Sequence, residues 1–411
     1  MTFIQFLVPG VVLAIICSTG NVLAESDAPF PITVAEAREM QKEVALPITA
    51  FYETEVPLPA GKPGQLIRSE PFDGYNFPDG TTPEDMGIRV VRFLYHSQAV
   101  DGTDVPASGV VLIPYGKPPA GGWPVVVWAH GTSGVGRIAA PSLRKDLYYG
   151  WQGLLEWPML GYAVIAPDYA GLGTNVPHQY LAASAQANDV IYAVPAARAA
   201  VPGLGEKWVA VGHSQGGGAV VKAAEMDVTI LDPGYLGAIA LAPAGDLQAG
   251  AAQINDSMFR GYAAFAAFGI KAVFPEFKYR DLLTPEATAL MPVASDNGWL
   301  VTMATFAYEV PAGKVLKSNW MENAYFRQMR GLSMLGERPT RGPLLLVAGI
   351  DDLTVPVDSI AATYERMLKQ GSDVEYRTYA GLDHDPLVFG TFRDQFRWVE
   401  DRFAGKPIGG Q

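Results

Sequence analysis

The stretch WVAVGHSQGGGAVV, residues 208–221, contains an apolar run, a serine among glycines and a segment typical of a helix. Residues 208–212 are almost wholly apolar, as expected of a strand buried on both faces. Ser214 follows, with Gly212 and Gly216 two residues to either side. This G-x-S-x-G pattern is typical of a sharp strand-to-helix turn that exposes a serine above a sheet. With the strand before it and the helix after it, the stretch predicts a nucleophile rather than a flexible turn.

Similar apolar runs recur along the chain and alternate with segments of helical length. The runs are residues 124–129, 162–166, 236–242 and 343–348, and the helical segments are residues 187–200, 217–226 and 358–369. Residues 88–96 and 109–114 are expected to form an antiparallel hairpin through a turn at Asp101 and Gly102, and Pro195 to kink or interrupt the first helix. The alternation predicts an α/β fold, with a mostly parallel central sheet and helices on both faces.

One interval breaks this alternation. The 98 residues between Ala244 and Pro343 contain no clear buried strand, but they are rich in aromatic residues and methionines. A loop of that length without structure is uncommon. We therefore expect residues 245–342 to form a helical cap, or lid, inserted in a core made of residues 25–244 and 343–411. Most of its aromatic side chains should pack in its own core, and a few should face a pocket.

The composition excludes several classes of function. Hydrophobic residues make up 49% of the chain and charged residues 18%, which is typical of a globular protein. The formal net charge is −12 without any lysine- or arginine-rich run, so nucleic acid is not an expected partner. Cys17 is the single cysteine, so the chain after residue 24 has no thiol for catalysis, disulfides or metal binding. With no H-E-x-x-H or G-K-[ST] motif either, we expect no metal and no cofactor.

Residues 1–24 are expected to be a secretory signal peptide. They carry no charged side chain, include an apolar run that ends near Cys17 and finish in VLA, which suits a small-residue cleavage rule. Because no Lys or Arg precedes the run and Pro9 interrupts it, an uncleaved N-terminal anchor is the alternative. No other segment reaches the 18 or so apolar residues of a membrane span. We therefore expect a soluble protein that is secreted or periplasmic.

A serine hydroxyl is a weak nucleophile at neutral pH and needs a base, usually a histidine that a carboxylate orients. The chain has five histidines, which makes elimination practical. Only His384, in GLDHDPL, lies late in a loop after a predicted last strand at residues 374–379. Folds with this serine turn place the triad in the order serine, acid, histidine. His384 satisfies that order and is the expected base.

The remaining groups of the expected site follow two buried strands. In PLLLVAGIDDLTVPV, Asp352 is the favoured acid and Asp351 the alternative, because a carboxylate beyond a strand's carboxyl end can meet a histidine of the next loop. An oxyanion hole needs two backbone N–H donors. We expect one on Gln215, directly after the nucleophile, and the other on Thr132 in WAHGTSG, with Gly131 as the alternative.

These blocks resemble the α/β-hydrolases of the secretory lipase family, which includes fungal lipase A. The resemblance rests on FYETEVPLPAGKPGQLIRSE (51–70), VVLIPYGKPPAGGWPVVVWAHGTSG (110–134), PDYAGLGTNVPHQYL (167–181), GHSQGG, GIDDLTVP and GLDHDP. It implies an ester hydrolase with the triad Ser214, Asp352 and His384, and a helical cap inserted before the acid. Ala170 stands where bacterial relatives often carry glutamate, so the loop at this position departs from the family's pattern.

Together these features predict a secreted serine ester hydrolase, a carboxylesterase or lipase, that works through an acyl-enzyme. A peptidase or amidase with the same triad is the alternative. A non-catalytic binding protein of the same fold is a further one, disfavoured because no triad member is missing. The expected partners are small-molecule or lipid esters, together with transient contact between the cap and a lipid interface.

Overall fold

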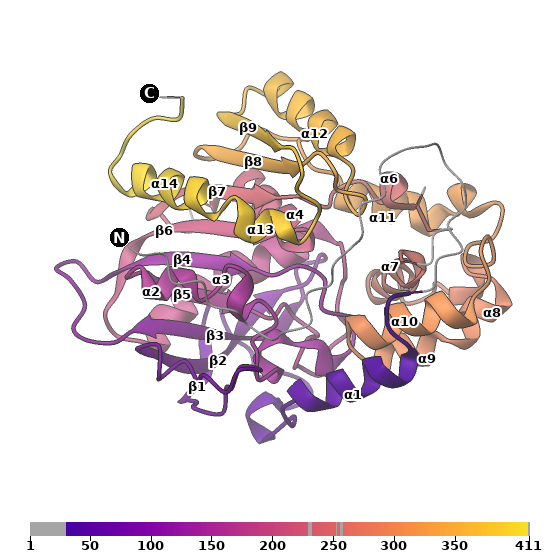
Figure 1. Ribbon diagram of the computed structural model, residues 1–411, viewed down its shortest axis with the longest axis horizontal. Helices are drawn as coiled ribbons and strands as arrows, with labels where there is room; N and C mark the ends of the chain where they lie inside the picture. Colours follow the sequence, from indigo (N-terminus) through magenta and orange to yellow (C-terminus); the bar gives the residue numbers. More distant parts are fainter. Residues whose placement is uncertain (1–29, 229–231, 252, 255–257, 410–411) are drawn as a thin grey trace.

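The computed structural model describes residues 30–228, 232–251, 253–254 and 258–409, so the expected signal peptide lies outside the described residues. A nine-stranded sheet in the order β1-β2-β3-β5-β4-β6-β7-β8-β9 forms its centre (Figure 1). The strands are β1 Leu66–Pro71, β2 Ile88–Gln98, β3 Asp104–Pro114, β4 Trp123–Ala129, β5 Ala163–Pro167, β6 Leu204–His213, β7 Tyr235–Leu241, β8 Leu344–Gly349 and β9 Val374–Tyr379.

The sheet is antiparallel at one side and parallel over the rest. β1, β2, β3 and β5 pair antiparallel in turn, and all pairs from β5–β4 to β8–β9 are parallel. The expected hairpin is present, with Gln98 opposite Asp104 at its turn end. β1 was not predicted, because its partly exposed residues form no apolar run. The α/β fold with a mostly parallel sheet is thus confirmed.

Helices cover both faces of the sheet. The core helices are α2 Glu156–Met159, α3 Ala183–Ala200, α4 Gln215–Glu225, α12 Val357–Lys369, α13 Pro386–Gly390 and α14 Phe392–Phe403. The sequence predicted that Pro195 would kink or interrupt this helix, and the interruption does not occur, because α3 continues through Pro195. Pro195 packs closely on Gly64, where an added Cβ would lie 2.5 Å from its ring. Burial of this helix offsets the stability that is lost because the proline cannot donate a backbone hydrogen bond.

The central strands separate two hydrophobic cores. In β4, Val125 and Val127 pack into one core, which also contains side chains of α3 and α4. Val126 and Trp128 pack into the other, which includes Trp398 of α14. Successive side chains of a strand point to opposite faces. A strand with helices on both sides therefore needs an unbroken apolar run, and VVVW provides it.

The segment between β7 and β8 is helical in its described part, and no named strand occurs there. Its helices are α6 Leu247–Ala251, α7 Arg260–Val273, α8 Pro285–Ala289, α9 Met291–Asp296, α10 Trp299–Glu309 and α11 Ala324–Ser333. Phe265, Met303 and Phe306 are fully buried in a third core. As Figure 1 shows, these helices gather at one end of the molecule, where α1 Val34–Val44 lies along α10. Most of the aromatic and methionine side chains thus pack within this segment.

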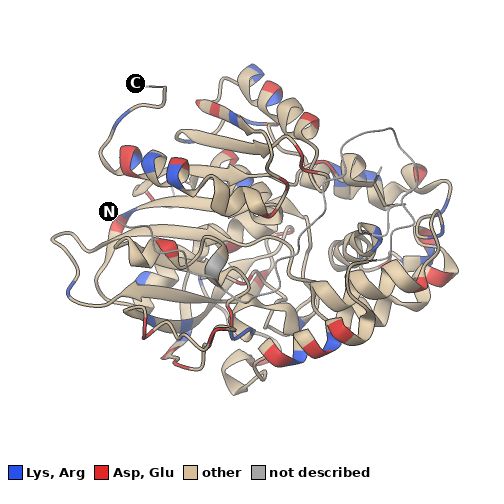
Figure 2. Ribbon diagram, in the orientation of Figure 1, with Lys and Arg blue, Asp and Glu red and all other residues tan. Residues whose placement is uncertain are grey.

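Charged residues lie mainly on the outer helices and loops (Figure 2). α1, α12 and α14 carry both signs of charge, whereas β4, β7 and β8 contain no Lys, Arg, Asp or Glu. In the described part of the chain, no helix combines the length and apolar character that crossing a bilayer requires.

Leu346→Ala in β8 is expected to lower the free energy of unfolding by about 2–5 kcal/mol, because it leaves a cavity in a closed core. Leu346 is fully buried, with Ala240 and Tyr376 as its partners in the neighbouring strands. Leu368→Ala on α12, where the leucine is 44% exposed, is the matched control and should change it by only about 0.5 kcal/mol. Urea unfolding followed by circular dichroism measures both values. Equal losses in the two variants would contradict the burial of β8.

Candidate active site

Ser214 occupies a strained turn between β6 and α4. Its backbone dihedrals are φ 56° and ψ −117°, a conformation that residues with a side chain seldom adopt. Three backbone hydrogen bonds hold it there. Its N–H donates to Leu241 O at 2.9 Å, and its carbonyl accepts from the N–H groups of Gly218 and Ala244 at 3.0 Å each. The turn is therefore fastened to the helix that follows and to the end of β7.

The glycines around Ser214 allow backbones to approach one another closely. A Cβ on Gly212 would lie 2.2 Å from Gly216 O, and a Cβ on Gly216 would lie 1.9 Å from Ala129 O at the end of β4. On Gly218 it would lie 2.3 Å from Ala244 O. No side chain fits at these distances. The glycines thus have a packing role in addition to the flexibility that their number suggests.

His384 and Asp352 form a buried pair at the same edge of the sheet. Asp352 follows β8, and its Oδ2 lies 2.8 Å from His384 Nδ1. Its Oδ1 accepts hydrogen bonds from the N–H groups of Thr354 and Val355, both at 2.8 Å. Asp352 is buried and Asp351 is exposed. The structure thus places Asp352, and not Asp351, against His384.

The surroundings of His384 favour its protonated form. Burial alone lowers the pKa of His384, but the hydrogen bond and charge of Asp352 oppose this effect. The charges of Asp385 and Asp383 act in the same direction as Asp352, so the net result is a pKa raised above the usual histidine value. A base with a raised pKa accepts a proton more readily once it is neutral.

Ser214 and His384 are not bonded to each other. No hydrogen bond joins Ser214 Oγ to His384 among the described residues. The serine turn nevertheless contacts His384 through His213, the residue before Ser214, because the ring centroids of the two histidines lie 4.5 Å apart. Catalytic hydrogen bonds are often long in ligand-free proteins and tighten when substrate binds.

The loop after β4 is held by hydrogen bonds to its carbonyl groups. His130 Nδ1 lies 2.6 Å from Gly131 O, and the Tyr148 hydroxyl donates to Thr132 O at 2.5 Å. The pKa of the buried Tyr149 hydroxyl is raised, first by burial, while a backbone hydrogen bond with Gly131 opposes the rise. In a trans peptide the C=O and the next N–H point in opposite directions. The contact at Gly131 O therefore also sets the direction of the Thr132 N–H.

Three further histidines lie around the serine turn. Elimination among the candidate bases had excluded these three residues. His130, His178 and His213 are all buried. Desolvation lowers the pKa of His130 and of His178 to about 4, and that of His213 well below its usual value. They are therefore neutral at neutral pH. For two of them the sequence signal was their place in AHG and GHS, where His130 directly follows β4 and His213 ends β6. His96, by contrast, pairs with Asp104 across the β2–β3 hairpin.

His178 supports the residue that follows the serine. Its Nδ1 lies 2.9 Å from Ala170 O and its Nε2 lies 3.1 Å from Gln215 Nε2. Nδ1 must carry the proton to bond a carbonyl, so Nε2 accepts from the Gln215 amide. The loop at Ala170 thus contributes a backbone acceptor to this series of hydrogen bonds. The Ala170 N–H in turn donates to Asp189 Oδ2 at 3.0 Å.

A mainly apolar cavity opens beside Ser214. The segment after β7 and helix α7 provide much of its wall. Apolar lining residues include Leu181, Ala244, Leu247, Ile254, Phe259 and Ala266. Thr132 and Tyr180 also line it, and their hydroxyl groups lie 2.8 Å apart. An apolar chain attached to a group at Ser214 would find an apolar surface here.

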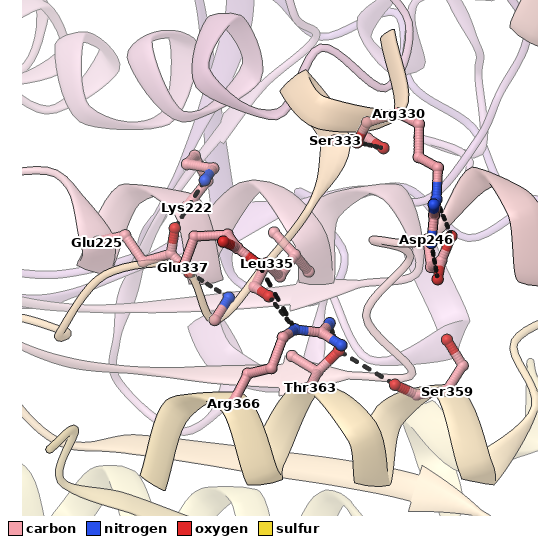
Figure 3. Close-up of polar contacts among 11 residues, drawn as sticks. Lys222, Glu225, Asp246, Arg330, Ser333, Leu335, Glu337, Ser359, Thr363 and Arg366 are labelled. Atoms are coloured by element: carbon pink, nitrogen blue, oxygen red, sulfur yellow. Dashed lines mark hydrogen bonds and ion pairs between the residues drawn. The ribbon is translucent and has the colours of Figure 1, made fainter. Parts of the chain in front are cut away.

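Ion pairs and hydrogen bonds fasten the ends of the inserted segment to the core (Figure 3). Arg330 of α11 bonds both oxygens of Asp246, at 3.1 and 3.3 Å, and Asp246 also lines the cavity. Arg366 of α12 donates to Leu335 O at 2.9 Å, and the buried carboxylate of Glu225 accepts from the Gly336 N–H. The return of the chain from α11 to β8 is therefore bonded to α4 and α12.

One cluster in the described part of the chain has the spacing of metal ligands. Donor atoms of His213, His384 and Asp385 lie within 4.8 Å of one another. Both ring nitrogens of His213 already have protein partners, and His384 Nδ1 faces Asp352. We therefore assign these side chains to the hydrogen-bond network.

Gly216→Ala is expected to lower the free energy of unfolding by about 3 kcal/mol or more, because its methyl group would overlap the Ala129 carbonyl. Gly331→Ala, on an exposed face of α11 with open space around its α-carbon, is the matched control. It should raise stability by about 0.5–1 kcal/mol, because alanine favours a helix over glycine. Thermal and urea unfolding measure both. A Gly216 variant as stable as the parent would contradict the close approach.

The chain matches a known protein family and individual proteins. The model of the secretory lipase family matches residues 153–411, more than half of the chain. A secreted triacylglycerol lipase of Malassezia globosa is 22% identical over 390 residues, covering 88% of this chain and 80% of that protein.

Solved structures show the same fold. Candida antarctica lipase A in its closed state aligns with a TM-score of 0.73 at 15% identity, covering 89% of each chain. The rice cell wall degrading esterase LipA of Xanthomonas oryzae aligns with a TM-score of 0.65 at 20% identity, covering 83% of this chain and 98% of that one. The family match, which extends over the serine turn, the acid loop and the histidine loop, shows that the chain belongs to the secretory lipase family.

Proposed function

We propose that this chain is an exported serine hydrolase of carboxylic esters. The observation that carries the proposal is the meeting, at one sheet edge, of a strained serine turn and a buried histidine–carboxylate pair. A serine, a neutral histidine and a buried carboxylate are the groups that acyl transfer needs. The family supplies the ester as the class of substrate. Export is supported by relatives that are named secreted lipases and by the expected signal peptide at residues 1–24.

In the proposed mechanism, Ser214 Oγ attacks the ester carbonyl while His384 Nε2 takes its proton. Asp352 keeps the imidazole in the tautomer with its proton on Nδ1 and stabilises the imidazolium that forms. His384 then gives the proton to the leaving alkoxide, which departs as the alcohol and leaves an acyl-enzyme. Water, deprotonated by the same histidine, attacks the acyl carbon. The carboxylic acid leaves as Ser214 regains its proton.

The developing oxyanion needs donors that are not already in use. The N–H groups of Thr132 and Gln215 meet no acceptor among the described residues, although both positions are buried. At Gly131 the Tyr149 hydroxyl already lies close, since an added Cβ would lie 2.3 Å from it. This crowding favours Thr132 over Gly131 as the second donor. Gln215 begins α4, so its N–H also lies at the positive end of the helix dipole.

The inserted segment, residues 245–342, is proposed to act as a cap over the acyl-binding cavity. Phe259 and Tyr262 of this segment line the same cavity as Ser214. An apolar wall favours neutral or apolar acyl groups, as expected of a lipid or small-molecule ester. Tyr308 and Met321 of the segment are exposed, 46% and 53%, and are available for transient contact with a lipid interface.

Ser214→Ala is expected to abolish hydrolysis of p-nitrophenyl esters, lowering kcat by about 10⁴-fold or more with the fold intact, because the nucleophile is lost. Steady-state kinetics on esters from acetate to palmitate measure the loss, and for the parent they also measure the acyl length that the cavity accepts. Circular dichroism checks the fold. Ser333→Ala, which removes a serine from the same cavity, is the matched control and should retain activity.

If Ser214→Ala cleaved esters as fast as the parent, the assignment of the nucleophile would be wrong. Faster cleavage of matched p-nitroanilides than of esters would instead identify an amidase.

Asp385→Asn is expected to move the acidic limb of kcat/KM to lower pH. That limb reports the pKa of the free enzyme's base, which is active only when neutral. Burial lowers the pKa of His384, but Asp352, Asp385 and Asp383 outweigh it, so removing the Asp385 charge should lower the pKa and leave more neutral base in acid. Asp401→Asn, an equal charge change at the C-terminal end of α14, is the control. Identical limbs in all three proteins would contradict this electrostatic account.

A further inference from the structure

The two buried side chains Tyr149 and His213 form a hydrogen-bonded chain that ends on the histidine loop. The Tyr149 hydroxyl lies 2.6 Å from His213 Nδ1, and His213 Nε2 lies 3.1 Å from the backbone carbonyl of His384. Tyr149 is 5% exposed and His213 1% exposed. The mechanism above uses neither of these side chains.

The acceptors in this chain determine where its protons lie. A carbonyl oxygen can only accept, so His213 Nε2 must carry a hydrogen. Burial, and next the charge of His384, keep the pKa of His213 well below its usual value, so the ring is neutral and Nδ1 is an acceptor. The Tyr149 hydroxyl therefore donates to Nδ1. Without that donor, the other tautomer would become available, and its Nε2 lone pair would face the lone pairs of the His384 carbonyl.

The backbone holds Tyr149 firmly in place. An added Cβ on Gly131 would lie 2.3 Å from the Tyr149 hydroxyl and 3.3 Å from His213 Nδ1. Leu147 and Tyr148, just before Tyr149, both have positive φ values of 54° and 64°, which are unfavourable for such residues. Strained backbone persists only where its surroundings over-determine it. Here the two tyrosine hydroxyls do so, one on Thr132 O and the other on His213.

We propose that Tyr149 and His213 are positioning residues, which hold the His384 loop so that its imidazole faces Ser214. This inference rests on the proposed function, because it assigns a role within the same reaction. Asp352 fixes the side chain of His384 through Nδ1, whereas His213 fixes its backbone. The residue before the nucleophile thus connects the serine turn to the base. A misplacement of about 1 Å at such a group can lower the rate about 100-fold.

The test compares Tyr149→Phe with the parent by titrating active sites with a p-nitrophenyl phosphonate and measuring kcat and KM on p-nitrophenyl butyrate. Tyr149→Phe should lower kcat per titrated site and the phosphonylation rate by about tenfold, with KM within twofold, because binding surfaces are unchanged. Tyr75→Phe is the matched control. Tyr75 is equally buried, and its hydroxyl donates to the backbone carbonyl of Ser142 at 3.0 Å. The Tyr75→Phe variant should leave kcat per titrated site and the phosphonylation rate unchanged.

Two variants of His213 separate positioning from packing. His213→Gln keeps an acceptor and a donor on one side chain and should retain more of kcat than His213→Phe, which keeps a ring but no hydrogen bond. An unchanged kcat per titrated site in Tyr149→Phe would overturn the inference while the parent's activity upheld the proposed function. A Tyr149→Phe variant that lost only titratable sites, with kcat per site unchanged, would also overturn the inference. A parent that neither reacts with the phosphonate nor cleaves esters would overturn the proposed function and this inference together.

Discussion

The Gly216 backbone packs directly on the Ala129 carbonyl, and the geometry of the whole site follows from that contact. It brings the start of α4 against the end of β4, at a distance that excludes even a methyl group. The serine turn and the loop that carries Thr132 are therefore held as one unit. This arrangement forces Ser214 into a strained backbone conformation with positive φ. Three backbone hydrogen bonds, to β7, α4 and Ala244, maintain that conformation. The turn places Ser214 at the wall of the apolar cavity beyond the edge of the sheet.

The parallel part of the sheet brings the other groups to the same place. Strands β4, β6, β8 and β9 run in one direction, so their carboxyl ends lie along one edge. Thr132, Ser214, Asp352 and His384 each follow one of these ends. The strands can run parallel because helices bury both of their faces, which their apolar runs permit. Burial of the strands and assembly of the site are thus two results of one pattern. An antiparallel sheet of the same length would divide these loops between two edges.

Much of this arrangement could be predicted from the sequence, because the signals involved are local. VVVW and LLLVA indicate buried strands, and the glycines around Ser214 indicate a tight turn. Elimination among five histidines leads to His384, which the structure places on Asp352. β1 and α1 were missed, because partly exposed elements show no apolar run. The contact between His213 and His384 joins residues that are 171 positions apart in the sequence. No local sequence pattern predicts a contact over that separation.

Three buried histidines of this site, His130, His178 and His213, are neutral and have no part in the proposed reaction. Their role is to hold neighbouring groups in place. A neutral imidazole has one donor and one acceptor, so it can bond two unlike groups and fix their relative positions. His178 and His213 each do so, bonding a carbonyl on one side and a donor on the other. His130 differs, since its nitrogens face two carbonyl oxygens, Gly131 O at 2.6 Å and Asp168 O at 3.0 Å. A neutral ring can donate to only one of them, and the shorter contact favours Gly131. The proton of His130 then lies where it sets the direction of the Thr132 N–H.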